Sequence, residues 1–284
     1  MKISIIVPTY NNFEYLKFFL LSLKINSNFE HEIILHINEG SDGTLDYAIK
    51  NNIKYTHSKE NIGLCSSMNR AYALTSTNYI LYAHDDMYFC KNWDIYLISE
   101  INKQKNNFYY LTGINVSTTY GLINFDCGND LSNFDKIKFN NFCLTDTTGD
   151  LQGSHWAPHL IHREMWEKIG GFSEEFNPGD GSDPDFCMKL WLSKVRFFKG
   201  VAKFKVYHFS SLTTRNQKIT LNNGTRQFLL KYGFNPRFFR KYYLRGDNSI
   251  IPFIGELSNP KITFFMLRDL LINKFKYFLL RIKS

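Results

Sequence analysis

The sequence predicts an α/β protein with a mostly parallel sheet flanked by helices and a basic helical extension at its C-terminus. In the first hundred residues, short apolar runs alternate with segments of helical periodicity. Parallel strands need such crossover helices, so the alternation favours a doubly wound sheet. From Lys194 to the end, 19 Lys and Arg stand against 3 Asp and Glu, which makes the extension strongly basic.

The individual elements follow from periodicity and from turn residues. Strands are expected over residues 3–8, 31–37, 53–58 and 78–83, with helices between them over 13–25, 44–52 and 63–75. In such sheets ligands bind beyond the carboxyl ends of the strands. The segments that follow three of these strands, "PTYNN", "NEGSDGT" and "HDDM", are therefore expected to line one crevice.

The alternation becomes less regular from about residue 108. Residues 108–117 and 202–208 are expected to be strands and 183–194 a helix, whereas 158–172 should be a strand running into a short helix. Polar residues 120–150 are expected to form loops, and helices outside the sheet should follow His208. We expect one domain over 1–211, with halves of about 1–107 and 108–211, and a helical, aromatic-rich region over 212–284.

Composition narrows the class of protein. With 44% hydrophobic and 17% aromatic residues the chain is a folded globular protein. No apolar run approaches the roughly 18 residues of a membrane span, and no signal peptide is recognisable. The residues before Lys194 carry a net charge of about −8, which argues against nucleic-acid binding. An odd number of cysteines without a CxxC pair favours free thiols and a cytoplasmic location: Cys65, Cys90, Cys127, Cys143 and Cys187.

The triplet His84-Asp85-Asp86 follows the apolar run 79–83 directly. Two adjacent carboxylates repel each other, and burying either one is costly without a partner. A divalent cation would relieve this repulsion, and a nucleotide diphosphate would supply further oxygen ligands. The alternative is an acid pair exposed on a loop.

Six segments in order point to one family. They are "IVPTYNN", "NEGSDGT", "NIGLCSSMNRAY", "YILYAHDDMY", "IGGFSEEF" with "DGSDPDFCMKLW", and "VYHFSS". Between Ile3 and Ser211 this series resembles the family-2 glycosyltransferases, which are inverting nucleotide-sugar enzymes of the GT-A fold. The resemblance implies transfer of a sugar from a nucleotide donor, with UDP as the expected nucleotide, to a hydroxyl of a glycan or glycolipid acceptor.

The resemblance also implies roles for individual residues. Asp86 corresponds to the direct metal ligand, and His208 to a histidine that can complete the shell of Mn²⁺ or Mg²⁺. His84 replaces the usual first acid, and "NEGSDGT" is one residue short and lacks the usual base-binding aspartate. Arg70 is expected to contact a phosphate or to pair with the acids. The expected donor-binding residues are Pro8, Thr9, Tyr10, Asn38, Glu39, Asn61, Arg70 and Asp85.

The acceptor side has its own candidates. Asp183 in "GSDPDF" matches the position of the general base, with Ser182 in place of a glutamate. The alternative for Asp183 and Asp185 is capping of the helix N-terminus. His155 and Trp156 are expected to form an acceptor wall. A zinc site among the histidines of 155–162 is disfavoured, because Pro158 would break the helix needed to align them.

Three hypotheses about function therefore stand beside one another. Besides the glycosyltransferase, the residues allow a catalytically silent sugar- or nucleotide-binding module. A sugar nucleotidyltransferase is disfavoured, because "VPTYNN" lacks the glycine-rich loop that cradles a triphosphate. The segment 261–284 resembles a basic amphipathic helix. This helix is expected either to dock on an anionic membrane at the cytosolic face or to pack onto a second subunit or onto the preceding domain of the same chain.

Overall fold

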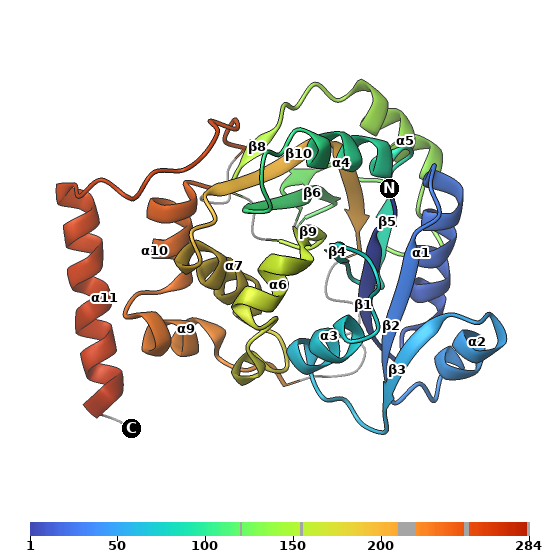
Figure 1. The fold of residues 1–284 in the computed structure, drawn as a ribbon, viewed down its shortest axis with the longest axis horizontal. Coiled ribbons are helices and arrows are strands. Elements are labelled where there is room, and N and C mark those ends of the chain that lie inside the picture. The colour runs from blue at the N-terminus through green and yellow to red at the C-terminus, as the bar shows by residue number, and fades with distance from the viewer. Residues whose placement is uncertain (120, 154–155, 210–219, 247–249, 283–284) are drawn as a thin grey trace.

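A computed structural model of the chain describes residues 1–119, 121–153, 156–209, 220–246 and 250–282. One mixed sheet forms its centre, with helices packed on both sides (Figure 1). The strand order in the described residues is β3-β2-β1-β4-β9-β6-β10-β5, and two short strands add to it, β7 beside β6 and β8 beside β10.

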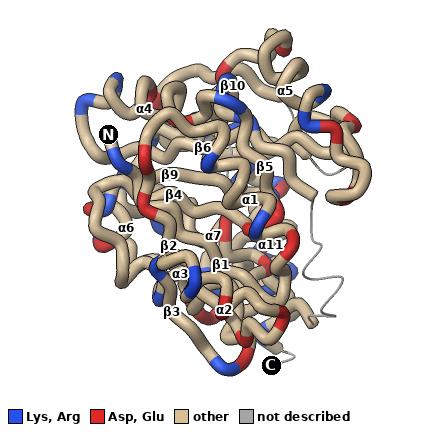
Figure 2. Tube along the Cα trace, turned by 90° about the vertical axis from the view of Figure 1, so that its right-hand side faces the viewer, with Lys and Arg blue, Asp and Glu red and all other residues tan. Residues whose placement is uncertain are grey.

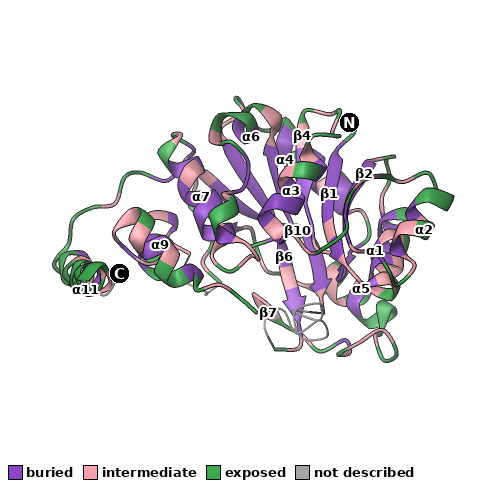
Figure 3. Cartoon of the chain, turned by 90° about the horizontal axis from the view of Figure 1, so that it is seen from below, coloured by how far each residue is buried: buried purple, intermediate pink, exposed green. Residues whose placement is uncertain are grey.

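The first half of the sheet is parallel, as the sequence predicts. It consists of β1 (Ser4–Tyr10), β2 (Glu32–Asn38), β3 (Lys54–Ser58) and β4 (Tyr79–Tyr82). The crossovers are α1 (Phe13–Asn26), α2 (Thr44–Lys50) and α3 (Leu64–Tyr72). Strands β1 and β2 carry unbroken apolar runs because helices cover both faces of this half, and Figure 3 shows these strands as buried.

The second half mixes strand directions. Strand β9 (His159–His162) runs antiparallel to β4 and to β6 (Tyr109–Ser117), whereas β10 (Phe197–His208) is parallel to β6 and antiparallel to β5 (Met87–Phe89). The short strands are β7 (Ile123–Asn124) and β8 (Leu151–Gln152). The remaining helices here are α4 (Trp93–Asn102), α5 (Lys136–Thr145), α6 (Arg163–Ile169), the 3₁₀ turn η1 (Glu174–Phe176) and α7 (Ser182–Leu192).

Several elements differ from the sequence-based expectation. Strand β5 and helix α4 are additional, and β10 begins at Phe197 rather than at residue 202. The prediction that 120–150 form only loops is wrong, because α5 lies within this segment. Of the residues of α5 only Phe139 is buried, so the helix has no apolar periodicity to reveal it. Its N-terminus is held by Asp135, whose carboxylate accepts a hydrogen bond from the Lys138 backbone N–H at 2.9 Å.

The described residues after β10 contain several helices outside the sheet, as predicted. It contains α9 (Gly224–Tyr232), α10 (Pro236–Phe239), the π-helical turn η2 (Arg240–Leu244) and α11 (Phe264–Ile282). Helix α9 is tied to α7, because Asp185 accepts hydrogen bonds from Tyr232 Oη at 2.7 Å and from Lys231 Nζ at 2.8 Å. Phe228 and Phe239 belong to the same apolar core as the sheet. A domain boundary near residue 211 stays a prediction.

Helix α11 differs from the other C-terminal helices in its exposure. It lies at the edge of the molecule, remote from the sheet, and Figure 3 shows most of its residues as exposed. None of the helices in the described residues is long and apolar enough to cross a membrane. On the side of the molecule that carries α1 and α2, positive and negative residues are interspersed rather than separated into single-signed areas (Figure 2).

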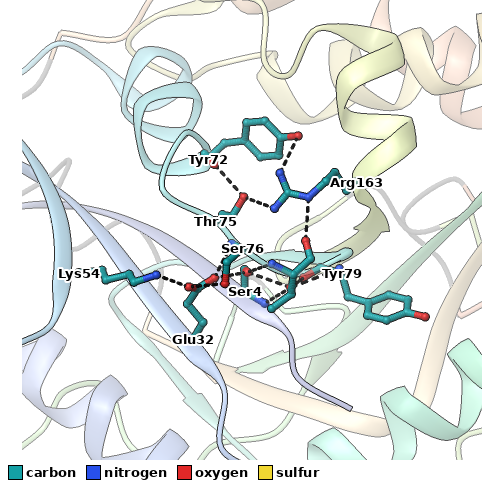
Figure 4. Close-up of polar contacts among 9 residues, drawn as sticks. Ser4, Glu32, Lys54, Tyr72, Thr75, Ser76, Tyr79 and Arg163 are labelled. Atoms are coloured by element: carbon teal, nitrogen blue, oxygen red, sulfur yellow. Dashed lines mark hydrogen bonds and ion pairs between the residues drawn. The ribbon is translucent and has the colours of Figure 1, made fainter.

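The amino ends of the parallel strands are joined by a polar network centred on Glu32 (Figure 4). The Glu32 carboxylate accepts hydrogen bonds from Ser4 Oγ at 2.5 Å, from Ser76 N and Oγ at 2.8 Å each, and from Lys54 Nζ at 2.5 Å. These partners begin β1 and β3 or precede β4. Burial opposes ionisation of Glu32, but the hydrogen bonds outweigh it and lower its pKa from 4.5 to about 2.

A second part of the network joins β9 and α6 to this edge. The Arg163 guanidinium donates to Thr77 O at 2.8 Å, to Thr75 Oγ1 at 2.7 Å and to Tyr72 Oη at 3.3 Å (Figure 4). Arg163 follows β9 directly, so these bonds lock the mixed half of the sheet onto the end of α3 and the turn before β4. Ordered, fully bonded polar groups therefore occupy the edge opposite the expected crevice.

Glu32→Gln is expected to lower the free energy of unfolding by about 2 kcal/mol at pH 7, the usual loss for hydrogen bonds to a charged group. Because the folded pKa of Glu32 is depressed, its contribution is complete above about pH 4.5 and is lost as the pH falls toward 2. Urea unfolding at pH 7 and at pH 3 measures both effects. The exposed Glu30→Gln is the control, and an equal loss in both variants would contradict this role of Glu32.

Candidate active site

The carboxyl ends of β1, β2 and β4 meet at one edge of the sheet. Tyr10 at the end of β1 lies beside Asn38 at the end of β2 in the parallel register. Just beyond β1, the Asn12 amide donates a hydrogen bond to Asp85 Oδ1 at 3.0 Å, which joins this loop to the His84-Asp85-Asp86 triplet. The expected convergence of the segments after the strands is thus present.

His84, Asp86 and His208 form a cluster at this edge. One ligand atom from each lies within 4.8 Å of the others. Asp86 Oδ1 is 3.0 Å from His208 Nε2, which in turn is 3.3 Å from His84 Nδ1. His208 reaches this position because β10 pairs antiparallel with β5, placing His208 opposite Met87. The Phe209 backbone N–H also donates a hydrogen bond to Asp86 O at 3.2 Å, which connects the end of β10 to the His84-Asp85-Asp86 segment.

The charges of this cluster depend on one another. Burial opposes the charged form of both Asp86 and His208, but their contact outweighs it, lowering the pKa of Asp86 and raising that of His208. Burial and the neighbouring His208 lower the pKa of His84 to about 4, so His84 is neutral at pH 7. The contact with Asp86 therefore favours the protonated form of His208, which offsets part of the repulsion between the adjacent carboxylates.

Arg70 is not the positively charged partner of Asp85 and Asp86. It lies exposed in the last turn of α3 and makes no ion pair with Asp85 or Asp86 among the described residues. Helix α3 begins at the crevice and leads away from it, which carries Arg70 off the edge that holds the acids. The expectation that Arg70 pairs with the acids is wrong, and its contact with a phosphate stays a prediction.

Tyr82 supports His84 from below. The Tyr82 hydroxyl is 2.6 Å from His84 Nε2, and the tyrosine side chain is buried at the end of β4. Burial, followed by the charge of nearby Asp183, raises the pKa of Tyr82 well above its ordinary value, so the hydroxyl stays protonated. When His84 carries its proton on Nε2 and donates it to Tyr82 Oη, the lone pair of Nδ1 faces the cluster and is open to a cation.

Asp85 is buried and Asp183 is half-buried, and each has one buried carboxyl oxygen that is unsatisfied. Asp85 Oδ2 and Asp183 Oδ1 have no hydrogen-bond partner among the described residues. Burial, followed by repulsion from Asp86, raises the pKa of Asp85. Burial raises the pKa of Asp183 to about 7, although the positive field of His208 opposes this shift. Since an unpaired buried polar group costs free energy, both acids are placed to meet a ligand.

Asp183 and Asp185 both lie in the first turn of α7, where negative charge is favourable, but neither caps the helix by a hydrogen bond. Helix α7 begins after Gly181, and no side chain caps its N-terminus by a hydrogen bond. One carboxylate oxygen of Asp185 accepts hydrogen bonds from Lys231 and Tyr232 of α9, so Asp185 joins α7 to α9. The first turn of α7 therefore holds Asp183 near His208 without a capping hydrogen bond from its side chain.

The expected nucleoside-binding residues surround the ends of β1 and β2. Thr9 Oγ1 is buried without a partner among the described residues, next to the half-buried Pro8 and Tyr10. Glu39 is half-buried and accepts a hydrogen bond from Ser41 Oγ at 2.8 Å. Both polar atoms of Asn38 are already occupied, with bonds to Thr9 O, Ser67 Oγ, Ser58 Oγ and Ile62 N. Glu39 is thus the more accessible of the pair.

Helix α3 closes the crevice on the side of the second half. Asn61 accepts a hydrogen bond from Gly63 N at 2.9 Å and shapes the turn that opens α3. Asn177, which precedes α7, caps this helix by accepting from Cys65 N at 3.0 Å. A side chain at Gly63 would collide with Asn177, whose Oδ1 would lie 2.4 Å from a Cβ, so the glycine permits this close approach.

Of the two expected acceptor residues, the structure describes one. Trp156 is 38% exposed, and the Arg240 guanidinium lies 6.0 Å from the centre of its ring. His155 lies outside the described residues. His159, which a zinc site would use, is instead buried among aromatic rings that include Tyr110 and Phe186.

One residue of the cluster was missed as a candidate ligand. His84 stands where the resemblance expects an acid, and its imidazole was treated as a departure from the pattern. The signal was its position, because His84 is the second residue after β4 and shares the sheet edge with Asp86.

Comparisons with known proteins show the family to which the chain belongs. The chain matches the glycosyl transferase family 2 over residues 4–199. S. aureus TarS 1–349 has a similar fold with a TM-score of 0.54 and 19% identity, covering 74% of this chain and 61% of TarS 1–349. GalNAc-T7 has a TM-score of 0.56 and 16% identity, covering 79% of this chain and 45% of its own.

Both structural neighbours are longer than the region of them that aligns with this chain. The chain spans less than two thirds of the length of either protein, and identities below one fifth establish the fold alone. No curated protein matches the chain. The family match covers more than half of the residues, with the strand-end segments inside it. The chain therefore belongs to glycosyl transferase family 2 and has the GT-A fold.

Proposed function

We propose that this protein is an inverting, metal-dependent glycosyltransferase that moves a sugar from a UDP-sugar to a hydroxyl of a glycan or lipid-linked glycan. The observation that carries the proposal is the pair of unsatisfied buried carboxyl oxygens, on Asp85 and Asp183, around the His84–Asp86–His208 cluster. A donor sugar and an acceptor hydroxyl would give each of these acids the partner that it lacks.

The donor nucleotide is proposed from the structural neighbours. S. aureus TarS 1–349 is known in complexes with UDP and with UDP-GlcNAc, and GalNAc-T7 in a complex with UDP, GalNAc and Mn²⁺. We assign the nucleoside to the surface of Pro8, Thr9, Tyr10 and Glu39, with Asn38 holding the strand ends in place. Asn61 and Arg70 on the α3 side, together with Asp85, would contact the remainder of the donor.

The cluster fits a divalent metal. Two imidazoles and one carboxylate converge, and the neutral state of His84 is the form that binds metals. Two nitrogen ligands suit Mn²⁺ better than Mg²⁺, which prefers an all-oxygen shell. A bound metal would stabilise the negative charge that develops on the departing diphosphate.

The reaction then follows from the positions of the protein's own groups. Asp183 accepts the proton of the acceptor hydroxyl as the oxygen forms a bond to the anomeric carbon. The bond from that carbon to the diphosphate oxygen breaks, and UDP leaves with the bonding electrons. Attack from the face opposite the leaving group inverts the anomeric configuration. Trp156 and His155 are proposed to hold the acceptor, with the tryptophan stacking on a sugar face.

Replacing the base tests catalysis directly. Asp183→Asn is expected to lower kcat by about 10²–10⁴-fold because the amide cannot accept the proton, while UDP binding in the presence of Mn²⁺ is retained. Sugar transfer and donor hydrolysis with labelled UDP-sugars measure kcat, and calorimetry measures UDP binding. Asp180→Asn in the same loop is the control, since an amide oxygen can still accept the hydrogen bond from Gly224 N. Unchanged turnover in Asp183→Asn would contradict the role of Asp183 as the base. Wild-type protein that binds UDP without any turnover would instead favour the silent binding module.

Tyr82→Phe tests the metal site. Without the Tyr82 hydroxyl the proton on His84 Nε2 has no acceptor, so Mn²⁺ affinity is expected to fall roughly 10-fold or more. The signal of free Mn²⁺ in electron paramagnetic resonance measures the affinity without requiring turnover. Tyr79→Phe, at the other end of the same strand, is the control. Equal Mn²⁺ affinity in all three proteins would rule out this supporting role of Tyr82.

A further inference from the structure

Helix α11 has an inner face that holds it to the protein. Met266 and Asn273 are its buried residues, and Asn273 Oδ1 accepts a hydrogen bond from Asn235 N at 2.9 Å. Asp269 on the same face is bound by Lys241 at 2.9 Å and by Tyr242 at 2.7 Å. These contacts come from η2 and from the turn before α10, and they fix which side of α11 faces outward.

The outer face of α11 is a row of large apolar side chains. Its members are spaced by seven, four, three and four residues, which places them on one side of a helix opposite Met266 and Asn273. Between 59% and 77% of each is exposed: Phe264, Leu271, Phe275, Phe278 and Ile282. A continuous exposed apolar stripe of this kind marks a surface that meets another apolar phase.

Positive charges border the stripe on both sides. Helical spacing puts Lys274 and Arg281 on one flank and Lys276 on the other. Asp269 is the only acid between Lys261 and the C-terminus, and it is engaged on the inner face. The outer face of α11 is therefore apolar in the middle and positive at its borders.

A basic pocket lies next to the stripe. Between α10 and α11 there is a cavity of about 270 Å³, and Arg237, Lys241 and Arg268 line it together with Asp269. Lys241 and Arg268 share Asp269, whereas Arg237 is exposed and makes no ion pair among the described residues. Ile272, another lining residue, is 48% exposed, so the pocket opens beside the apolar surface. Its charge suits a phosphate group.

We propose that α11 and this pocket form a docking surface for an anionic phospholipid bilayer. The stripe enters the interface between headgroups and acyl chains with the helix in the membrane plane, and the pocket takes a lipid phosphate. A second copy of the chain fits less well, because α11 paired with itself would bring cations against cations without a free acid to match them. The proposal goes beyond sugar transfer and does not depend on the donor site.

Vesicle co-sedimentation of the full chain tests the proposal. We expect binding to vesicles of phosphatidylcholine mixed with an equal amount of phosphatidylglycerol, and little binding to phosphatidylcholine alone. Arg237→Glu/Lys274→Glu/Lys276→Glu should weaken binding by roughly 100-fold or more, since each cation near such a surface contributes about fivefold. Phe275→Asp/Phe278→Asp should abolish it. Ile137→Asp on α5, at a residue that is 74% exposed, is the matched control and should bind as wild type.

The contrary outcomes are equally clear. No binding of the wild type to the mixed vesicles, or equal binding by the wild type and both sets of variants, would overturn the proposal. A dimer in light scattering that Phe275→Asp/Phe278→Asp dissociates, without vesicle binding by the wild type, would assign the face to a second copy instead. Metal-dependent UDP binding by each variant checks its folding, and its loss in the wild type would count against the donor site rather than against docking.

Discussion

The crevice depends on one electrostatic constraint, which is the burial of two adjacent carboxylates at the end of β4. Asp85 and Asp86 are each 5% exposed, so their repulsion is not screened by water. The mixed half of the sheet reduces this repulsion, because it places His208 Nε2, at the end of β10, 3.0 Å from Asp86 Oδ1. The order β4-β9-β6-β10-β5 therefore also brings the His208 imidazole to the site.

The two edges of the parallel half of the sheet differ in how completely their polar groups are hydrogen-bonded. At the amino edge, Glu32 and Arg163 bond with several partners each, and this network holds the strand starts in register. At the carboxyl edge, oxygens of Asp85 and Asp183 remain unsatisfied although buried. A fold stabilised at one edge can tolerate strained electrostatics at the other, which is where a ligand would relieve them.

The sequence predicts what local patterns encode. The strands β1 to β4 and their helices follow from apolar runs and periodicity. Asp86 and Asp183 became candidates through the family resemblance of the short segments that contain them. Helix α5 was missed because burial of Phe139 alone leaves no period to detect. Arg70 and His84 could not be judged without the structure, because their neighbours depend on the direction of α3 and on the pairing of β10 with β5.

The central claim is that His84, Asp86 and His208 hold one metal ion. Electron spin echo spectroscopy of the protein with bound Mn²⁺ and UDP detects nitrogen nuclei in the first coordination shell. Coupling to two imidazole nitrogens, reduced to one in His84→Ala and also in His208→Ala, is the predicted result. An Mn²⁺ ion that binds with UDP but shows no imidazole coupling would contradict the claim and place the metal elsewhere.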